Sequence, residues 1–332
     1  MAREKLRFLV LDSETATLPF ANEIANDNPE LKKKIAIAKP LIYDLAWVIA
    51  HRDGTIVEKK QFLIAETFAV PSVFNTAYYK EKRPLYLEMI RKSEIAVLPW
   101  EAVMREFVAD LETVDYVGAF NSMFDFCKAL PFTELYINKL YSDDYYDWEK
   151  TQHRICSNIV NNLPSRRNPN FDEKAFHFRG RVYPLFDIWG MACDRLLNRV
   201  AYKNLCLDLG MITNSGDFFK TSAESSYRYL REEYDFDEAH TALADAEIET
   251  YILSKILHYG KIEIGIDFFP FRKLGTTTSF LIERKYPKME RVKAVYDIMD
   301  NYVGGEATTN YKKQILNKMV ILKELMEEEE GE

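Results

Sequence analysis

Short apolar runs that alternate with helical segments constrain this chain more than any other feature of its sequence. Residues 6–12 are predicted to form a buried strand, and residues 115–120 a further strand that leads directly into a helix. A strand followed at once by a helix is the repeating unit of α/β folds. The sequence therefore predicts an α/β fold.

A hairpin lies between these two strands. The apolar run 41–51 is separated from a second run, 55–64, by Asp53-Gly54. An Asp-Gly step favours a tight turn between antiparallel strands. Because a strand at 182–188 and an amphipathic helix at about 241–258 continue the alternation, we expect a mixed sheet flanked by helices.

Two segments do not fit this alternation, a charged one at about 21–40 and a longer one at 141–181. We interpret both as insertions in one domain that spans residues 1–260. A loop as long as the second one is usually functional. Residues 261–332 change character and are interpreted as a mainly helical C-terminal extension packed on that domain.

The composition excludes disordered and fibrous classes, because 47% of the 332 residues are hydrophobic and only 12 are glycine and 12 proline. No stretch approaches the ~18 uncharged apolar residues of a membrane span, and the N-terminus lacks a signal-peptide pattern. We therefore expect a soluble, cytoplasmic protein without a membrane partner. The four cysteines form no CxxC pair, which predicts reduced core thiols rather than a zinc site.

Two carboxylates, Asp12 and Glu14, stand at the C-terminal end of the first predicted strand. Side chains alternate along a strand, so both face one side while Ser13 faces the other. Carboxylates this close repel each other unless a cation lies between them. A charged strand end in solvent is the alternative interpretation, but α/β sheets place their sites at such ends.

Asp125 lies in the first turn of the helix that follows strand 115–120, and His240 and Asp245 lie near the start of the last amphipathic helix. Five residues correspond to about 500° of helix, so His240 and Asp245 cannot share a face of a regular helix. With Thr241 as N-cap, His240 lies in the entering loop and is able to point toward a site. An ordinary helix-start aspartate and an incidental histidine are the alternatives.

Together these residues form three motifs in a fixed order: Asp12-x-Glu14-Thr15, Asn121-x-x-Phe124-Asp125 and His240-x-Ala-x-x-Asp245. The pattern resembles the DEDD superfamily of 3′-to-5′ exonucleases in its histidine-bearing branch, which includes proofreading subunits and ribonuclease T-like enzymes. The sister branch carries a tyrosine where this chain has Thr241. The resemblance covers about residues 5–258 and implies a ribonuclease H-like domain.

The resemblance also implies a metal-dependent phosphodiester hydrolase whose ligands are Asp12, Glu14, Asp125 and Asp245. Hard oxygen ligands favour Mg²⁺ or Mn²⁺, and two such ions ~4 Å apart can stabilise both the attacking and the leaving oxygen. His240, as a neutral imidazole, is expected to take a proton from the attacking water.

Nucleic-acid contacts are expected near these motifs, from Thr15, Leu18, Asn121 and Phe124. For Leu18 and Phe124 the alternative is core packing. Residues 150–181 offer a further surface, because they hold seven basic and two acidic residues with Phe171, Phe176 and Phe178 interleaved. Cations beside aromatic rings suit single strands. We therefore expect contacts from Arg166, Arg167 and Arg179, with a solvated loop and a few buried phenylalanines as the alternative.

The expected function is 3′-to-5′ exonuclease activity on single-stranded or frayed DNA, with RNA trimming by the same chemistry as the alternative. The formal net charge of −8 does not oppose this, because six glutamates lie within the last nine residues. A polymerase-accessory or scaffold module is the competing class, and the presence of all four carboxylates argues against it. Hydrolysis of small nucleotides is a third alternative. A replication or repair protein is considered as a partner, and the oligomeric state is left open.

Overall fold

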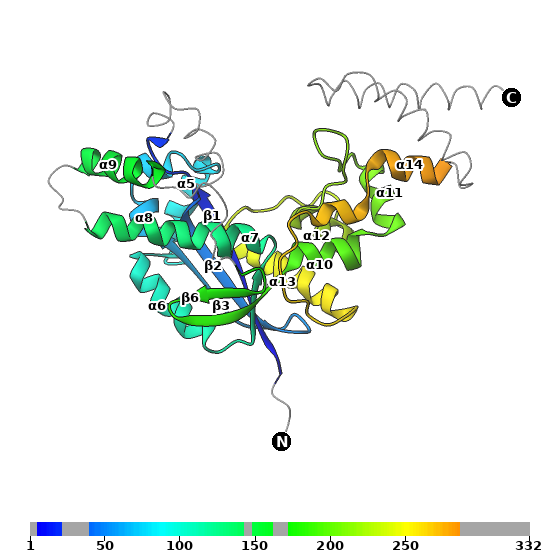
Figure 1. The fold of residues 1–332 in the computed structure, drawn as a ribbon, viewed down its shortest axis with the longest axis horizontal. Coiled ribbons are helices and arrows are strands. Elements are labelled where there is room, and N and C mark those ends of the chain that lie inside the picture. The colour runs from blue at the N-terminus through cyan, green and yellow to red at the C-terminus, as the bar shows by residue number, and fades with distance from the viewer. Residues whose placement is uncertain (1–4, 22–39, 143–147, 162–171, 286–332) are drawn as a thin grey trace.

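The computed structural model describes residues 5–21, 40–142, 148–161 and 172–285. These residues form a seven-stranded mixed sheet flanked by helices (Figure 1), which confirms the predicted α/β class. The strand order is β4-β3-β2-β1-β5-β7-β6. The strands are β1 (Arg7–Ala16), β2 (Leu41–His51), β3 (Ile56–Ile64), β4 (Ala96–Leu98), β5 (Tyr116–Ala119), β6 (Ala175–Phe178) and β7 (Arg181–Asp187).

Strand β1 lies at the centre of the sheet and determines where the site can form. It pairs antiparallel with β2 and parallel with β5, which in turn pairs parallel with β7. The predicted hairpin is β2–β3, and Gly54 in its turn has a positive φ of 83°. Because β1, β5 and β7 are parallel, their carboxyl ends meet at one edge. This arrangement is compatible with a ribonuclease H-like fold.

Helices cover both faces of the sheet. They are α3 (Ala65–Phe68), α4 (Pro71–Phe74), α5 (Arg83–Arg91), α6 (Trp100–Leu111), α7 (Ser122–Phe124), α8 (Leu130–Ser142), α9 (Trp148–Asn161), α10 (Ile188–Ala192), α11 (Val200–Asp208), α12 (Ala223–Arg231), α13 (Ala242–His258) and α14 (Thr277–Lys285). Shorter helical turns are η1 (Lys80–Lys82), η2 (Asp125–Ala129), η3 (Cys193–Leu197) and η4 (Pro270–Leu274). Of these, η2 and η3 are π-helical.

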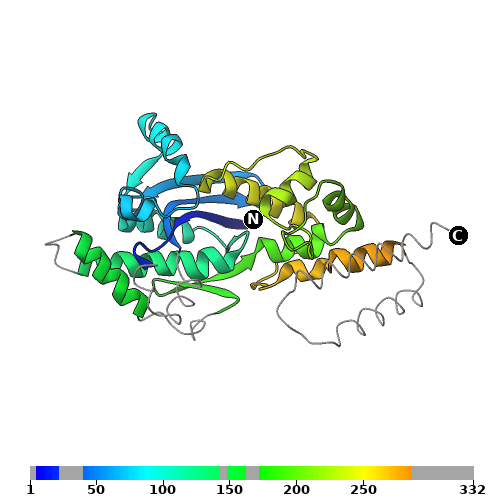
Figure 2. The same cartoon turned by 90° about the horizontal axis from the view of Figure 1, so that it is seen from above.

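Alternation along β1 divides the hydrophobic core into two parts. Leu9 and Leu11 pack in a cluster with residues of α6 and α8, whereas Phe8 and Val10 pack with residues of α10 and α13. Figure 2 shows α8 and α9 side by side at the end of the molecule far from α14. The face of β1 that carries the even-numbered residues therefore looks toward α13, which also contacts β2.

The segment 141–181 is not one continuous loop, which corrects the prediction. Its C-terminal part forms β6, an edge strand that pairs with β7, and Phe176 and Phe178 are buried in the main core. The turn between β6 and β7 consists of Arg179 and Gly180, both with positive φ, as two-residue hairpins require. The alternation of apolar residues at 176 and 178 is the period of a strand rather than of a loop.

Several predictions concern residues outside the described ranges or residues of the C-terminal extension. Arg166, Arg167 and Phe171 lie outside the described residues, as do positions 22–39 of the first predicted insertion and positions 286–332 of the C-terminal extension. In the described part of that extension, Gly265 forms a parallel bridge with Phe186 at the sheet. None of the helices in the described part of the chain combines the length and apolar character that a membrane crossing requires.

Candidate active site

Carboxylates from separate parts of the chain surround Asp12, which lies in the middle of β1 because the strand extends past the predicted end to Ala16. Burial raises the pKa of Asp12 well above its ordinary value, and the negative charges of Glu249, Asp125, Asp245 and Glu14 raise it further. The fold therefore places all four carboxylates predicted as metal ligands close enough to interact electrostatically. They come from β1, from the start of η2 and from the first turn of α13.

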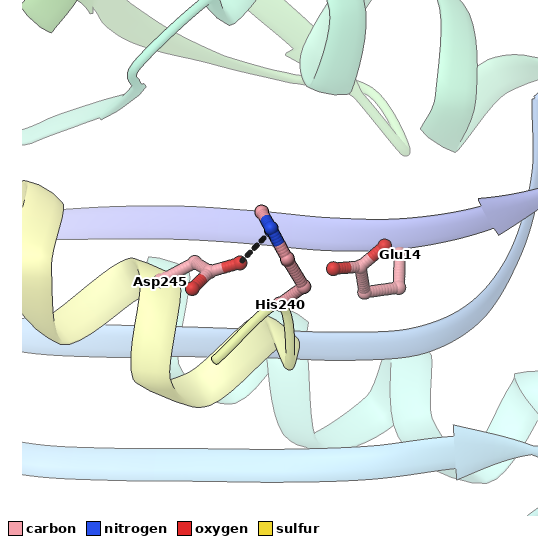
Figure 3. A group of neighbouring side chains, drawn as sticks. All are labelled: Glu14, His240 and Asp245. Atoms are coloured by element: carbon pink, nitrogen blue, oxygen red, sulfur yellow. Dashed lines mark ion pairs between the residues drawn. The ribbon is translucent and has the colours of Figure 1, made fainter. Parts of the chain in front are cut away.

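Glu14, His240 and Asp245 form the tightest group within this neighbourhood (Figure 3). Each offers one ligand atom, and these atoms all lie within 4.8 Å of one another. The imidazole lies between the two carboxylates in this view, and its Nδ1 is 4.0 Å from Asp245 Oδ2. His240 thus lies where it can serve either as a base or as an additional ligand.

The Asp245 carboxylate meets the conditions for holding a cation. Its Oδ1 atom is buried and has no hydrogen-bond partner among the described residues. Burial, followed by the charge of Glu238, raises the pKa of Asp245 to about 8. Burial, followed by the charge of Asp245, raises the pKa of Glu14 to about 9. A buried oxygen without a partner is unfavourable, and hard divalent cations such as Mg²⁺ and Mn²⁺ bind such oxygens, so the residues fit these ions.

Asp125 is held at the border of the group by a hydrogen bond. The Ser13 hydroxyl donates to Asp125 Oδ1 over 2.6 Å, and both side chains are buried. Burial, together with the negative charge of Asp187, raises the pKa of Asp125 to about 7. Asp125 begins the π-helical turn η2, a kind of turn that is frequent at functional sites. Asp12 and Asp125 therefore flank the closest group rather than belonging to it.

His240 is fixed by its backbone and by a neighbouring ring. Its φ is +50°, and its imidazole stacks on Tyr79 with ring centroids 4.4 Å apart and 15° between the planes. Burial lowers the pKa of His240, and the positive charge of Lys82 lowers it further. The Lys82 ammonium donates to the carbonyl of Ala239, the residue before the histidine. A lowered pKa keeps the imidazole neutral and able to accept a proton at neutral pH.

Thr241 occupies the N-cap position of α13 as predicted, but its hydroxyl does not cap the helix. The backbone N–H of Ala242 instead donates to Asp44 Oδ2 over 3.1 Å. Asp44 lies buried on β2 and also accepts from Tyr86 Oη at 2.8 Å and from Gln61 Nε2. A carboxylate is favoured at a helix N-terminus by the helix dipole, so Asp44 caps α13 from β2, the strand against which the helix packs.

Two further buried acids belong to the site although the sequence analysis did not single them out. Glu249 lies one turn after Asp245 on α13 and accepts the backbone N–H of Phe120 over 3.0 Å. Asp187 ends β7, and burial raises its pKa to about 7. The sequence held a sign of each. Glu249 follows Asp245 by four residues on the apolar face of the helix, and Asp187 ends an apolar strand.

The residues expected to contact nucleic acid differ in how far they are buried and in what they contact. Leu18 is only 3% exposed and packs in the core, which is the alternative we considered for it. Phe124 is half-buried against the same cluster, and Thr15 and Asn121 are half-buried at the edge of the site. Arg179 donates both guanidinium nitrogens to Glu101, at 3.0 and 2.7 Å.

Comparisons of the chain with protein-family models, with curated proteins and with solved structures give no match.

Proposed function

We propose that this chain is a metal-dependent 3′-to-5′ exonuclease that acts on single-stranded or frayed nucleic acid, with DNA as its expected substrate. The observation that carries the proposal is the buried Asp245 Oδ1, which has no hydrogen-bond partner among the described residues and lies in the group with Glu14 and His240. The raised pKa values of the surrounding acids support the proposal, because carboxylates with strongly shifted pKa values are frequent at sites that bind cations or transfer protons.

Asp12, Glu14, Asp125 and Asp245 would hold two Mg²⁺ or Mn²⁺ ions. When bound, such ions stabilise the charge on the attacking and leaving oxygens of a phosphodiester. His240 takes the proton from the attacking water, and Tyr79 holds the imidazole in position. Glu249 fixes the backbone of the turn that leads from β5 to Asp125.

The direction of hydrolysis and the preference for single strands come from the resemblance of the three motifs to the DEDD exonucleases. A scaffold or polymerase-accessory module would not need four acids and a neutral histidine gathered around one site. The presence of all five residues therefore supports an enzyme.

The proposal is tested with end-labelled single-stranded DNA, duplex DNA and RNA of one sequence, each incubated with Mg²⁺, Mn²⁺ or EDTA. We expect mononucleotides to be released from a 3′ end in the presence of either cation and no release in EDTA. The Asp245→Asn variant is the matched control for a contaminating nuclease. A 3′-phosphorothioate should slow release.

Two results would contradict the proposal. One is an absence of cation-dependent hydrolysis on all three substrates, which would favour the scaffold class. The other is cleavage of circular single strands at the rate of linear ones, which would define an endonuclease. Faster release from RNA than from DNA would instead identify the RNA-trimming alternative.

A further inference from the structure

A pocket rich in aromatic side chains lies among α10, η4 and the start of α12, and the proposed chemistry makes no use of it. Its volume is about 540 Å³, and its lining includes Trp189, Phe218, Phe271, Thr221 and Lys220. This volume lies in the range of pockets that hold small planar ligands. We call it the aromatic pocket.

Two lining residues relate the aromatic pocket to the candidate site. Trp189 stands two residues after Asp187, at the carboxyl edge that β7 shares with β1. Glu224, at the start of α12, also lines the pocket and lies close enough to act electrostatically on His240. A single strand whose 3′ end lies beside His240 is thus able to reach the aromatic pocket with a nucleotide on its 5′ side.

The rings of the aromatic pocket are held in place before any ligand binds. Trp189 Nε1 donates to the Thr221 hydroxyl over 2.9 Å, which fixes the plane of the indole. The Trp189 and Phe271 rings are nearly parallel, at 21° with centroids 6.2 Å apart. Phe218 meets Phe271 edge to face at 4.9 Å. All three rings are half-buried, so part of each remains available to a planar ligand.

The lining includes one basic residue, Lys220, and one acidic residue, Glu224, whose carboxylate pairs with Arg228. Lys220 is exposed, and its ammonium has no ion pair among the described residues. The Arg272 guanidinium, next to Phe271 in the chain, lies 4.5 Å from the centroid of the Phe269 ring. Aromatic faces together with cations bind unstacked bases and their phosphates, without sequence preference because every base has a π-face.

We propose that the aromatic pocket binds one unstacked base of the substrate strand, on the 5′ side of the nucleotide being removed, with Lys220 on the adjoining phosphate. This inference rests on the proposed nuclease function, because it assumes a strand whose 3′ end lies at the carboxylates. The ligand class is a nucleobase within a single strand of at least a few nucleotides.

The first test compares Phe271→Leu, Phe271→Tyr and Lys220→Gln in binding a labelled single-stranded oligonucleotide of about 16 nucleotides in EDTA. We expect Phe271→Leu to weaken binding roughly ten-fold through loss of one stacked base, and Phe271→Tyr to restore most of it. Lys220→Gln should make the affinity depend less steeply on salt concentration, by about the contribution of one phosphate contact. Tyr259→Ala is the matched control, because this exposed ring lies by the end of α13, at the opposite end of β1 from Glu14.

The second test places one abasic nucleotide at successive positions from the 3′ end. At the position that occupies the aromatic pocket, the missing base should weaken binding to the wild-type protein. The same substitution should have no further effect on Phe271→Leu, because the ring and the base belong to one contact. The ratio of kcat/KM for the long strand to that for a dinucleotide should also fall roughly ten-fold in Phe271→Leu.

The outcomes separate this inference from the function on which it rests. If the wild-type protein releases nucleotides but Phe271→Leu and Lys220→Gln bind like wild type, the aromatic pocket holds no base and only the inference is overturned. If Phe271→Leu and Tyr259→Ala weaken binding equally, the effect is general and the inference is overturned as well. If the wild-type protein neither binds nor hydrolyses single strands, both the inference and the proposed function are overturned.

Discussion

The imidazole ring of His240 lies flat against the phenol ring of Tyr79, with 4.4 Å between the centroids. The two residues come from distant parts of the chain, one before η1 and the other before α13. The stack closes one side of the imidazole to water and fixes its plane beside Glu14 and Asp245. Tyr79 is therefore a positioning residue for the proposed base.

The role of Tyr79 predicts a change in the pH dependence of hydrolysis. Burial lowers the pKa of His240, so in the wild-type protein the acid limb of the rate profile should lie below the ordinary histidine value of about 6.5. In Tyr79→Ala the ring gains solvent, its pKa rises, and the acid limb should move to higher pH. Tyr79→Phe keeps the stack and should retain the wild-type profile. Equal profiles in all three proteins would contradict this role.

Replacement of His240, the proposed base, should affect turnover more than replacement of Tyr79. His240→Ala is expected to lower turnover by roughly 10²-fold, within the usual range for general-base loss, and to leave cation binding largely intact. Rates at saturating Mn²⁺ and the cation dependence of unfolding measure the two effects separately. If rate and pH profile are both unchanged, His240 has a structural role only.

Asp12→Ala and Asp245→Asn should abolish hydrolysis while the fold is retained. Each removes a negatively charged group but no apolar core volume, so we expect the melting temperature in EDTA to be unchanged or higher through relief of carboxylate repulsion. Turnover and thermal unfolding measured on the same preparations check both parts. More than a tenth of wild-type turnover in both variants would contradict the site assignment.

Stability without metal should fall as pH rises. The pKa is raised to about 9 for Glu14, about 8 for Asp245 and about 7 for Asp125, against ordinary values near 4. The folded protein therefore keeps protons that the unfolded chain releases. This stabilisation is complete below about pH 4 and is lost as pH rises through the raised values, by about 1.4 kcal/mol per pH unit for each proton.

Urea unfolding in EDTA at several pH values between about 5 and 9 measures this dependence. Mg²⁺ should flatten it, because a bound cation replaces the protons among the carboxylates. In Asp245→Asn the free energy of unfolding in EDTA should depend less steeply on pH, by an amount that corresponds to at most one proton. Stability that rises with pH across this range in EDTA would contradict the prediction.

Asp44 predicts a stability effect at the start of α13. Asp44→Ala leaves the N–H of Ala242 and the donors of Tyr86 and Gln61 without their acceptor, which should lower the free energy of unfolding by about 2 kcal/mol or more. Asp44→Asn keeps an acceptor and should be destabilised less. Urea unfolding compares the two variants, and equal stability of Asp44→Ala and wild type would contradict the role of this carboxylate.

Local patterns predicted much of the fold and the residues around which the site forms. The Asp53-Gly54 turn, the strands and α13 follow from periodicity and turn chemistry, which act between neighbours in the chain. The stack of Tyr79 on His240 and the cap from Asp44 to Ala242 could not be predicted, because they depend on how distant segments pack. The segment around β6 was misinterpreted as part of a loop for a different reason: the apolar alternation of Phe176 and Phe178 spans a strand of only four residues.

The hydrogen bond between Asp44 and Ala242 joins residues that are 198 positions apart in the chain. During synthesis, Asp12, Glu14 and Asp125 leave the ribosome long before His240 and Asp245 are made. A chain that has not been extended past α13 thus carries only part of the group, and it lacks the helix that packs against β2. Chains that end before α13 should therefore lack the proposed nuclease activity, which requires that α13 has docked.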